Sequence, residues 1–97
     1  MNKSDRAEIY KKAQTVWGID TQISVAIEEF AELITALAKR KRIINGSTDK
    51  EIINEIADAW VMLEHLTLIY DEDKIMERIE YKVKRLKSWI DNNTKVW

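Results

Sequence analysis

Hydrophobic residues recur at three- and four-residue intervals along most of the chain. This spacing places them on one face of an α-helix. The pattern is interrupted at Gly18, at the breaker-rich segment 43–48 and near Tyr70, where the next residues are acidic. The sequence therefore predicts an all-α chain of four helices.

Capping residues set the expected ends of these helices. Ser4 can cap the first helix, and Gly18 is placed to terminate it. Asp20 or Thr21 then caps the second helix, and Thr48 opens a capping box for the third. The expected helices run from about 4 to 17, 20 to 42, 48 to 70 and 72 to 91.

The apolar stripes give the expected core. Trp60 falls on the stripe of the third helix, and both it and Trp89 of the fourth helix are expected inside. Some apolar residues lie off the stripes and need cover, which favours self-association; they are Val25, Val61, Leu68 and Ile69. The stripe of the second helix is Ile23, Ala26, Ile27, Phe30, Leu33, Ile34 and Leu37; that of the third is Ile52, Ile56, Ala59, Trp60, Leu63, Leu66 and Tyr70; that of the fourth is Ile75, Ile79, Val83, Leu86 and Ile90.

Two acidic clusters stand inside the second and third helices. Glu29 and Glu32 are three residues apart, as are Glu55 and Asp58, so each pair projects from one face. A turn near Asn45 joins the two helices into an antiparallel hairpin. Because this turn is about equally far from both clusters in sequence, the hairpin is expected to bring them to similar heights.

These acids lack the cations that usually accompany surface carboxylates. No Lys or Arg stands three or four positions from Glu29, Glu32, Glu55 or Asp58, although the fourth helix does pair its charges. Carboxylates without imidazole or thiolate suit a hard ion, so the pattern favours a Mg²⁺ or Mn²⁺ site. A bridged di-iron site is excluded because it needs Glu-x-x-His on two helices, whereas His65 is the only histidine and Met62 precedes it by three. His65 is expected to be structural or at the surface.

Composition narrows the function classes. The 97 residues imply a single domain, 1–97, with 45% hydrophobic and 34% charged residues. The net charge of -1 gives no reason to expect a nucleic-acid polymer or a membrane as a partner. The chain has no cysteine, and charged residues interrupt its start, so no disulfide framework, signal peptide or membrane span is expected. These features are compatible with a cytoplasmic protein.

The order of these motifs resembles the MazG-like all-α nucleoside triphosphate pyrophosphohydrolases, especially short phage and bacterial members. The residues that carry the resemblance are the acidic stretches 26–33 and 54–59 and the basic segment Tyr81-Lys82-Val83-Lys84-Arg85-Leu86. It covers most of residues 16 to 90. One departure is Glu80, where family members often carry Asn, and it leaves the substrate preference open. The resemblance implies a four-helix MazG-like bundle with a central acidic hairpin, assembled as a homodimer or homotetramer.

By this resemblance the chain would cleave an NTP or dNTP between the α and β phosphates, giving the monophosphate and pyrophosphate. Glu29, Glu32, Glu55 and Asp58 would bind Mg²⁺ or Mn²⁺. Glu28 is either an outer ligand, the general base for the attacking water, or simply solvated. Candidate substrate-binding residues are Lys82, Arg85 and Trp17.

Each of these substrate-binding assignments has a plainer alternative. Lys82 lies at the edge of the apolar stripe and either reaches a phosphate or extends to water. Trp17 either stacks on a base or packs in the core. The basic run 39–42 either complements a helix dipole or attracts phosphates. The competing function for the whole chain is a non-catalytic helical interaction module with a structural or vestigial metal site.

Overall fold

The computed structural model describes residues 1–93 and 97, and in this part of the chain it is all-helical. The four helices are α1 (Lys3–Trp17), α2 (Ile19–Ala38), α3 (Asp49–Ile69) and α4 (Glu72–Asn92). The predicted helix number and order are confirmed. None of these helices is long and apolar enough to cross a membrane.

The helix ends confirm some of the predicted caps and correct others. Thr48 and Glu51 form the expected capping box at the start of α3. The cap of α1 is Asn2 and not Ser4, because Asn2 and Asp5 exchange side-chain-to-backbone hydrogen bonds of 2.8 and 3.0 Å. α2 begins directly after Gly18, whose φ of 90° is a conformation that L side chains rarely adopt. Neither Asp20 nor Thr21 therefore caps it.

The second helix is also shorter than predicted. It ends at Ala38, so the basic run 39–42 belongs to the connection to α3. The carbonyl of Lys39 accepts hydrogen bonds from the amides of Arg42 and Ser47, and Asn45 adopts a left-handed φ of 56°. The amide of Lys39 still donates to the carbonyl of Thr35, but the amides of Arg40 and Arg42 donate to carbonyls only three residues back, so the α-helical pattern ends here.

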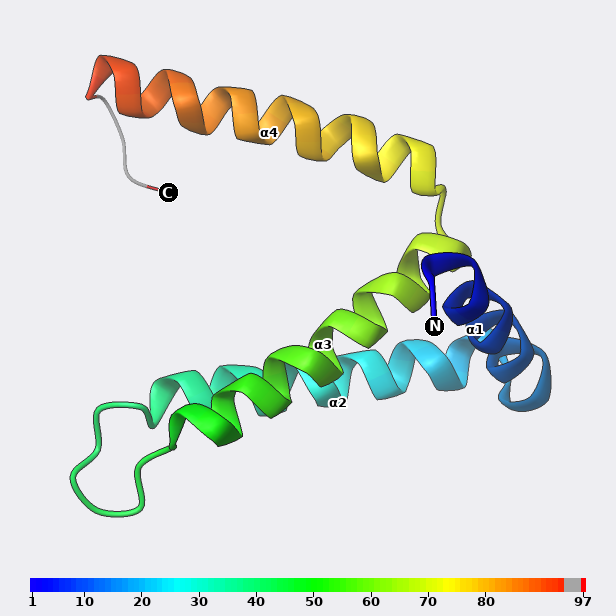
Figure 1. Ribbon diagram of the computed structural model, residues 1–97, viewed down its shortest axis with the longest axis horizontal. Helices are drawn as coiled ribbons and strands as arrows, with labels where there is room; N and C mark the ends of the chain where they lie inside the picture. Colours follow the sequence, from blue (N-terminus) through cyan, green and yellow to red (C-terminus); the bar gives the residue numbers. More distant parts are fainter. Residues whose placement is uncertain (94–96) are drawn as a thin grey trace.

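α1, α2 and α3 pack together, and α2 and α3 form the expected antiparallel hairpin (Figure 1). The core is small, and its buried apolar side chains are Tyr10, Ala26, Ala36, Ala59 and Met62. Alanines on both helices of the hairpin allow the two backbones to approach closely. This close approach brings the acidic side chains of α2 and α3 within reach of one another.

α4 leaves the end of α3 and runs apart from α2 (Figure 1). Its backbone approaches that of α3 near their junction and has no close approach to the backbone of α1 or α2. None of its described residues is buried. The apolar stripe of α4 was predicted to point into a core, but no other helix of the described chain covers it. Its members Ile79, Val83 and Ile90 are exposed.

The core prediction for Trp60 is wrong, because its side chain is 64% exposed. Ile56 and Leu63, which share its face of α3, are also exposed. At 100° per residue the apolar positions of α3 cover two faces of the helix, and α1 and α2 pack against only one of them. Trp89 is half-buried on α4. Of the four residues predicted to need cover, Val25, Leu68 and Ile69 are half-buried and Val61 is exposed.

Candidate metal centre

The predicted acidic residues meet at the crossing of α2 and α3. Each of Glu29, Glu32, Glu55 and Asp58 offers one carboxylate oxygen, and these four oxygens all lie within 4.8 Å of one another. Glu32 is exposed, and the other three side chains are half-buried. We call these four residues the acid cluster. The prediction that the hairpin would bring the two pairs together is confirmed.

Two oxygens of the acid cluster are buried without a hydrogen-bond partner: Oε2 of Glu29 and Oε2 of Glu55. No ion pair found among residues 1–93 and 97 includes a member of the cluster. A buried, unpaired carboxylate oxygen is costly, because it has lost its water and gained nothing in exchange. A bound cation satisfies such oxygens directly, so the donor set fits a metal ion.

The electrostatics of the cluster indicate the same need for positive charge. Burial raises the pKa of Glu29, and the negative charges of Glu32 and Asp58 raise it further. The pKa of Glu55 is raised by the same causes in the same order. In both residues the charged form is disfavoured by its surroundings, as expected for carboxylates held together without a counter-charge.

The composition of the site restricts the kind of cation. All four side chains are carboxylates, two from each helix, and the described part of the chain adds no histidine to the group. Mg²⁺, Ca²⁺ and Mn²⁺ prefer oxygen ligands, whereas Zn²⁺ and copper sites are built mainly from His and Cys. The acid cluster is therefore suited to a hard divalent cation.

The other candidate residues lie outside the cluster. Glu28 is exposed on α2, directly before Glu29, and is not one of the four clustered carboxylates. Trp17 is the last residue of α1 and is largely exposed, so the alternative that it packs in the core is wrong.

Lys82 and Arg85 are both on α4, whose backbone has no close approach to α2. Arg85 stacks on Trp89, with its guanidinium carbon 4.6 Å from the ring centroid. Its Nε is buried without a hydrogen-bond partner. The structure thus brings together the predicted metal ligands, and it places the predicted phosphate-binding residues on a separate arm of the chain.

A second polar group, not predicted from the sequence, joins α1 to α3. Arg6 donates two hydrogen bonds to Glu64, of 3.0 and 2.9 Å, and the hydroxyl of Tyr10 donates a third, of 2.7 Å. His65 is buried against the ring of Tyr10, with ring centroids 4.3 Å apart. The partners are more than fifty residues apart in sequence, so local spacing gives no signal for this group.

A comparison of the chain with protein-family models, with curated proteins and with solved structures finds no match.

Proposed function

We propose that this chain is a Mg²⁺-dependent nucleoside triphosphate pyrophosphohydrolase. The observation that carries the proposal is the acid cluster, with four carboxylates from two helices and two buried oxygens that lack partners. An all-carboxylate site repels a triphosphate unless cations lie between them. A site of this kind is useful to an enzyme acting on phosphates because it concentrates divalent cations where the substrate must bind.

The residues divide into separate roles in this proposal. Glu29, Glu32, Glu55 and Asp58 hold the cation, which neutralises phosphate charge and lowers the pKa of bound water. Glu28, exposed beside Glu29, is the candidate general base. Lys82 and Arg85 are candidates for phosphate binding and Trp17 for stacking on the base. For Lys82 and Arg85 this role requires an α4, of this chain or of a second copy, to approach the acid cluster.

The direct test is product analysis with a panel of NTPs and dNTPs in the presence of Mg²⁺. We expect monophosphate and pyrophosphate, with no diphosphate. In ¹⁸O-labelled water the position of the label identifies the attacked phosphorus, because attack at the α phosphorus labels the monophosphate and attack at the β phosphorus labels the pyrophosphate. Turnover should stop in EDTA.

Variants connect this activity to the acid cluster. Glu55→Gln is expected to abolish turnover, whereas Glu8→Gln, which changes an exposed acid on α1, should leave it unchanged. Release of diphosphate and orthophosphate, or full activity of Glu55→Gln, would contradict the proposal. If no nucleotide is cleaved but Mg²⁺ still stabilises the wild-type chain, the acid cluster is a structural metal site in an interaction module.

A further inference from the structure

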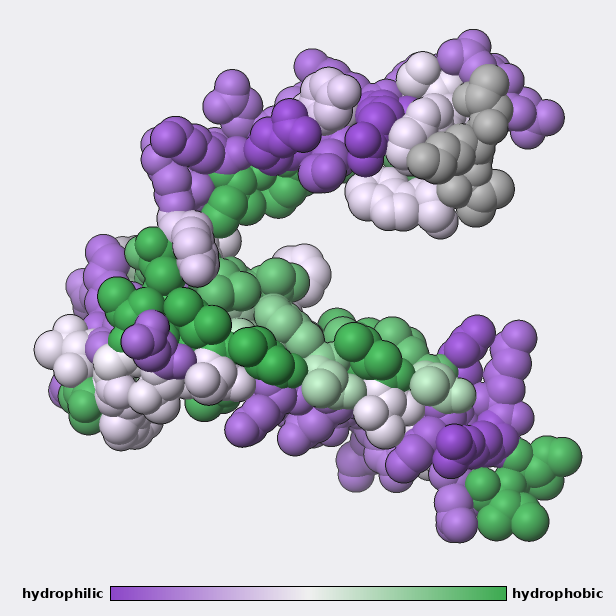
Figure 2. Space-filling model, turned by 180° about the vertical axis from the view of Figure 1, so that it is seen from behind, coloured by the Kyte–Doolittle hydropathy of each residue, from purple (hydrophilic) through white to green (hydrophobic). Residues whose placement is uncertain are grey.

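The connection between α2 and α3 presents cations and apolar side chains next to each other at the free end of the hairpin (Figure 1). Its exposed isoleucines are Ile43, at 99%, and Ile44, at 77%. Four consecutive cations come directly before them: Lys39, Arg40, Lys41 and Arg42. We call residues 39–44 the hairpin tip. Seen from behind, a hydrophobic patch lies beside hydrophilic surface at this end of the hairpin (Figure 2).

Backbone hydrogen bonds close the turn that contains the hairpin tip. The carbonyl of Lys39 accepts from the amide of Arg42, at 3.0 Å, and from that of Ser47, at 3.3 Å. A side chain at position 46 would overlap the carbonyl oxygen of Arg42, so the close approach of the backbone requires Gly46. The left-handed Asn45 precedes it, in a conformation that Asn tolerates better than β-branched residues do. The isoleucines are thus exposed on a turn of defined geometry.

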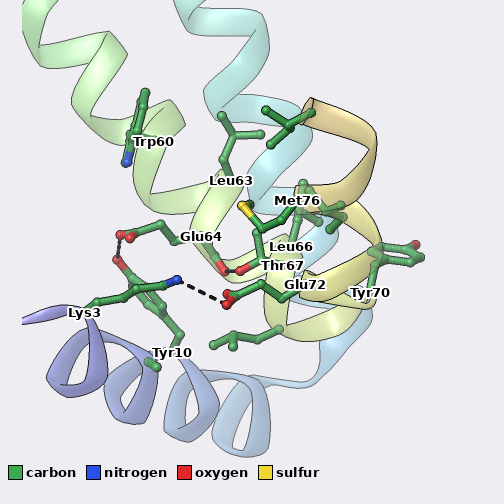
Figure 3. A pocket seen from close by; sticks show the side chains of 14 residues that line it. Lys3, Tyr10, Trp60, Leu63, Glu64, Leu66, Thr67, Tyr70, Glu72 and Met76 are labelled. Carbon is green, nitrogen blue, oxygen red and sulfur yellow. Dashed lines mark hydrogen bonds and ion pairs between the residues drawn. The ribbon is translucent and has the colours of Figure 1, made fainter. Parts of the chain in front are cut away.

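The isoleucines of the hairpin tip differ from other exposed apolar side chains of the chain. Leu63 and Met76 are about half exposed, yet they line one cavity of about 580 Å³ together with Leu66 (Figure 3). Ile43 lies almost wholly in water. Two adjacent isoleucines in water add no hydrophobic stabilisation to the fold, whereas burying them in an apolar layer outside the chain is favourable.

Charge is distributed unevenly between the hairpin tip and the rest of the chain. Residues 33–48 contain the four cations and no Asp or Glu, so the net charge of -1 consists of +4 at this end and -5 elsewhere. No ion pair found among residues 1–93 and 97 includes any of the four cations. An anionic surface therefore attracts the hairpin tip and repels the remainder, which orients the chain. The net charge of the whole chain conceals this asymmetry.

The residue types at the hairpin tip favour a lipid surface over a nucleic acid. Both partners offer phosphates to Lys and Arg. Surfaces that bind single-stranded nucleic acid add aromatic side chains for stacking, and residues 31–59 include none. An anionic bilayer instead offers an apolar layer directly beneath its charged headgroups, which can receive isoleucines while the cations stay at headgroup level.

We propose that the hairpin tip binds the surface of an anionic phospholipid bilayer. Ile43 and Ile44 insert below the headgroups, and the cations of residues 39–42 contact the lipid phosphates and carboxylates. The binding is peripheral and reversible, because two side chains bury little apolar surface. The inference uses no member of the acid cluster and is independent of the proposed enzymatic function.

Cosedimentation with lipid vesicles tests the proposal. The wild-type chain should bind vesicles of phosphatidylcholine mixed with phosphatidylserine, and binding should weaken as salt is added. It should bind pure phosphatidylcholine much less. The measurement is made in EDTA, so that no divalent cation bridges the acid cluster to a headgroup. Equal binding to both kinds of vesicle, or binding to neither, would overturn the proposal. A chain that binds a single-stranded oligonucleotide but no vesicle would assign the cations to nucleic acid instead.

Paired variants separate the two components of the hairpin tip. Lys41→Gln with Arg42→Gln should weaken vesicle binding roughly tenfold or more, and Ile43→Ser with Ile44→Ser should do the same without any change in charge. The matched controls are Lys11→Gln with Lys12→Gln, two exposed cations of α1, and Ile27→Ser with Ile34→Ser, two exposed isoleucines of α2. Both controls should bind as wild type does. Unchanged binding of either tip variant would contradict the proposal.

A fluorescent label reports insertion directly. The chain has no cysteine, so Ile43→Cys provides a single site for an environment-sensitive nitrobenzoxadiazole group. Its emission should shift to the blue and brighten on anionic vesicles, and brominated lipid chains should quench it. The same label at Ile34→Cys should not respond. Equal responses at both positions, or none at position 43, would show that the hairpin tip does not insert.

Discussion

Glu32 is the exposed member of the acid cluster, where four like charges are held together by two helices. Removing its charge with little change in shape, as in Glu32→Gln, should stabilise the metal-free protein. We expect a gain of roughly 0.2–0.5 kcal/mol, because solvent screens charges near the surface. Urea unfolding in EDTA measures this gain, and Glu28→Gln, outside the cluster, should give a smaller one.

The same substitution should weaken the effect of Mg²⁺, since only an ion bound to the folded chain adds stability. The wild-type chain should gain stability on addition of Mg²⁺, and Glu32→Gln should gain less. If Glu32→Gln unfolds at lower urea than wild type in EDTA, Glu32 is a structural hydrogen-bonding residue and charge repulsion does not dominate the site.

His65 makes the stability of the chain depend on pH. Burial lowers the pKa of its imidazole below the ordinary value of 6.5, and its Nδ1 has no hydrogen-bond partner. The contribution of neutral His65 to the free energy of unfolding is therefore fully present above pH 6.5. It is lost as the pH falls through the lowered pKa of the folded state. Nearby Glu64 opposes this shift but does not reverse it.

We expect the wild-type chain to lose more stability than His65→Phe between pH 7.5 and pH 5. Comparing the two proteins removes the contribution of the carboxylates, which titrate in both. Because His65 is the only histidine of the chain, NMR can also follow its titration directly. An imidazole pKa at or above 6.5 in the folded protein would refute this prediction.

At the scale of single residues, the sequence predicted the members of the acid cluster better than those of the core. Glu29 and Glu55 could be paired because helical spacing and the position of one turn determine where they meet. Trp60 could not be placed, because an apolar residue at helical spacing looks the same whether its own chain or another surface covers it. The contact between Tyr10 and His65 depends on how α1 packs on α3, which local spacing does not encode.

Among the elements, α1 is attached to α3 through Glu64. Its carboxylate accepts three hydrogen bonds from Arg6 and Tyr10, and the bond from Arg6 is the main cause of its lowered pKa. Glu64→Ala should cost about 1–3 kcal/mol, because hydrogen bonds to a charged group are lost and Tyr10 is left buried without a partner. This loss of stability should be largest in α1.

Hydrogen exchange locates this effect along the chain. In Glu64→Ala the amides of α1 should exchange faster, while those at the crossing of α2 and α3 should change little. The matched control is Lys3→Ala, which breaks the exposed ion pair with Glu72 and should change stability by less than about 0.5 kcal/mol. Uniformly faster exchange in all helices would show that α1 is not a separate unit.

The ends of the helices were predicted correctly at some side-chain caps and missed at others, as at Asn2. Thr48 and Glu51 form the capping box that their spacing predicts. The end of α2 was predicted four residues too late, because the basic residues after Ala38 are compatible with a helix and only the turn at Lys39 excludes one.

On the scale of the whole molecule, the chain consists of a three-helix body and one projecting helix. The regular spacing of apolar residues predicts the helix α4. It does not specify what the apolar face of this helix packs against. A stripe facing its own chain and a stripe facing another copy have the same pattern. The arrangement of α4 therefore had to come from the structure.

Because only Tyr70 and Asp71 connect α3 to α4, a small rotation at this junction moves the far end of α4 by a large distance. With roughly 1.5 Å of rise per residue, a helix of this length extends about 30 Å from its pivot. A rotation of about 10° at the junction would displace its far end by about 5 Å, and Lys82, halfway along, by about half as much. A substitution that changes how Met76 meets Leu66 would therefore also change the position of the cations of α4, most of all those toward its far end.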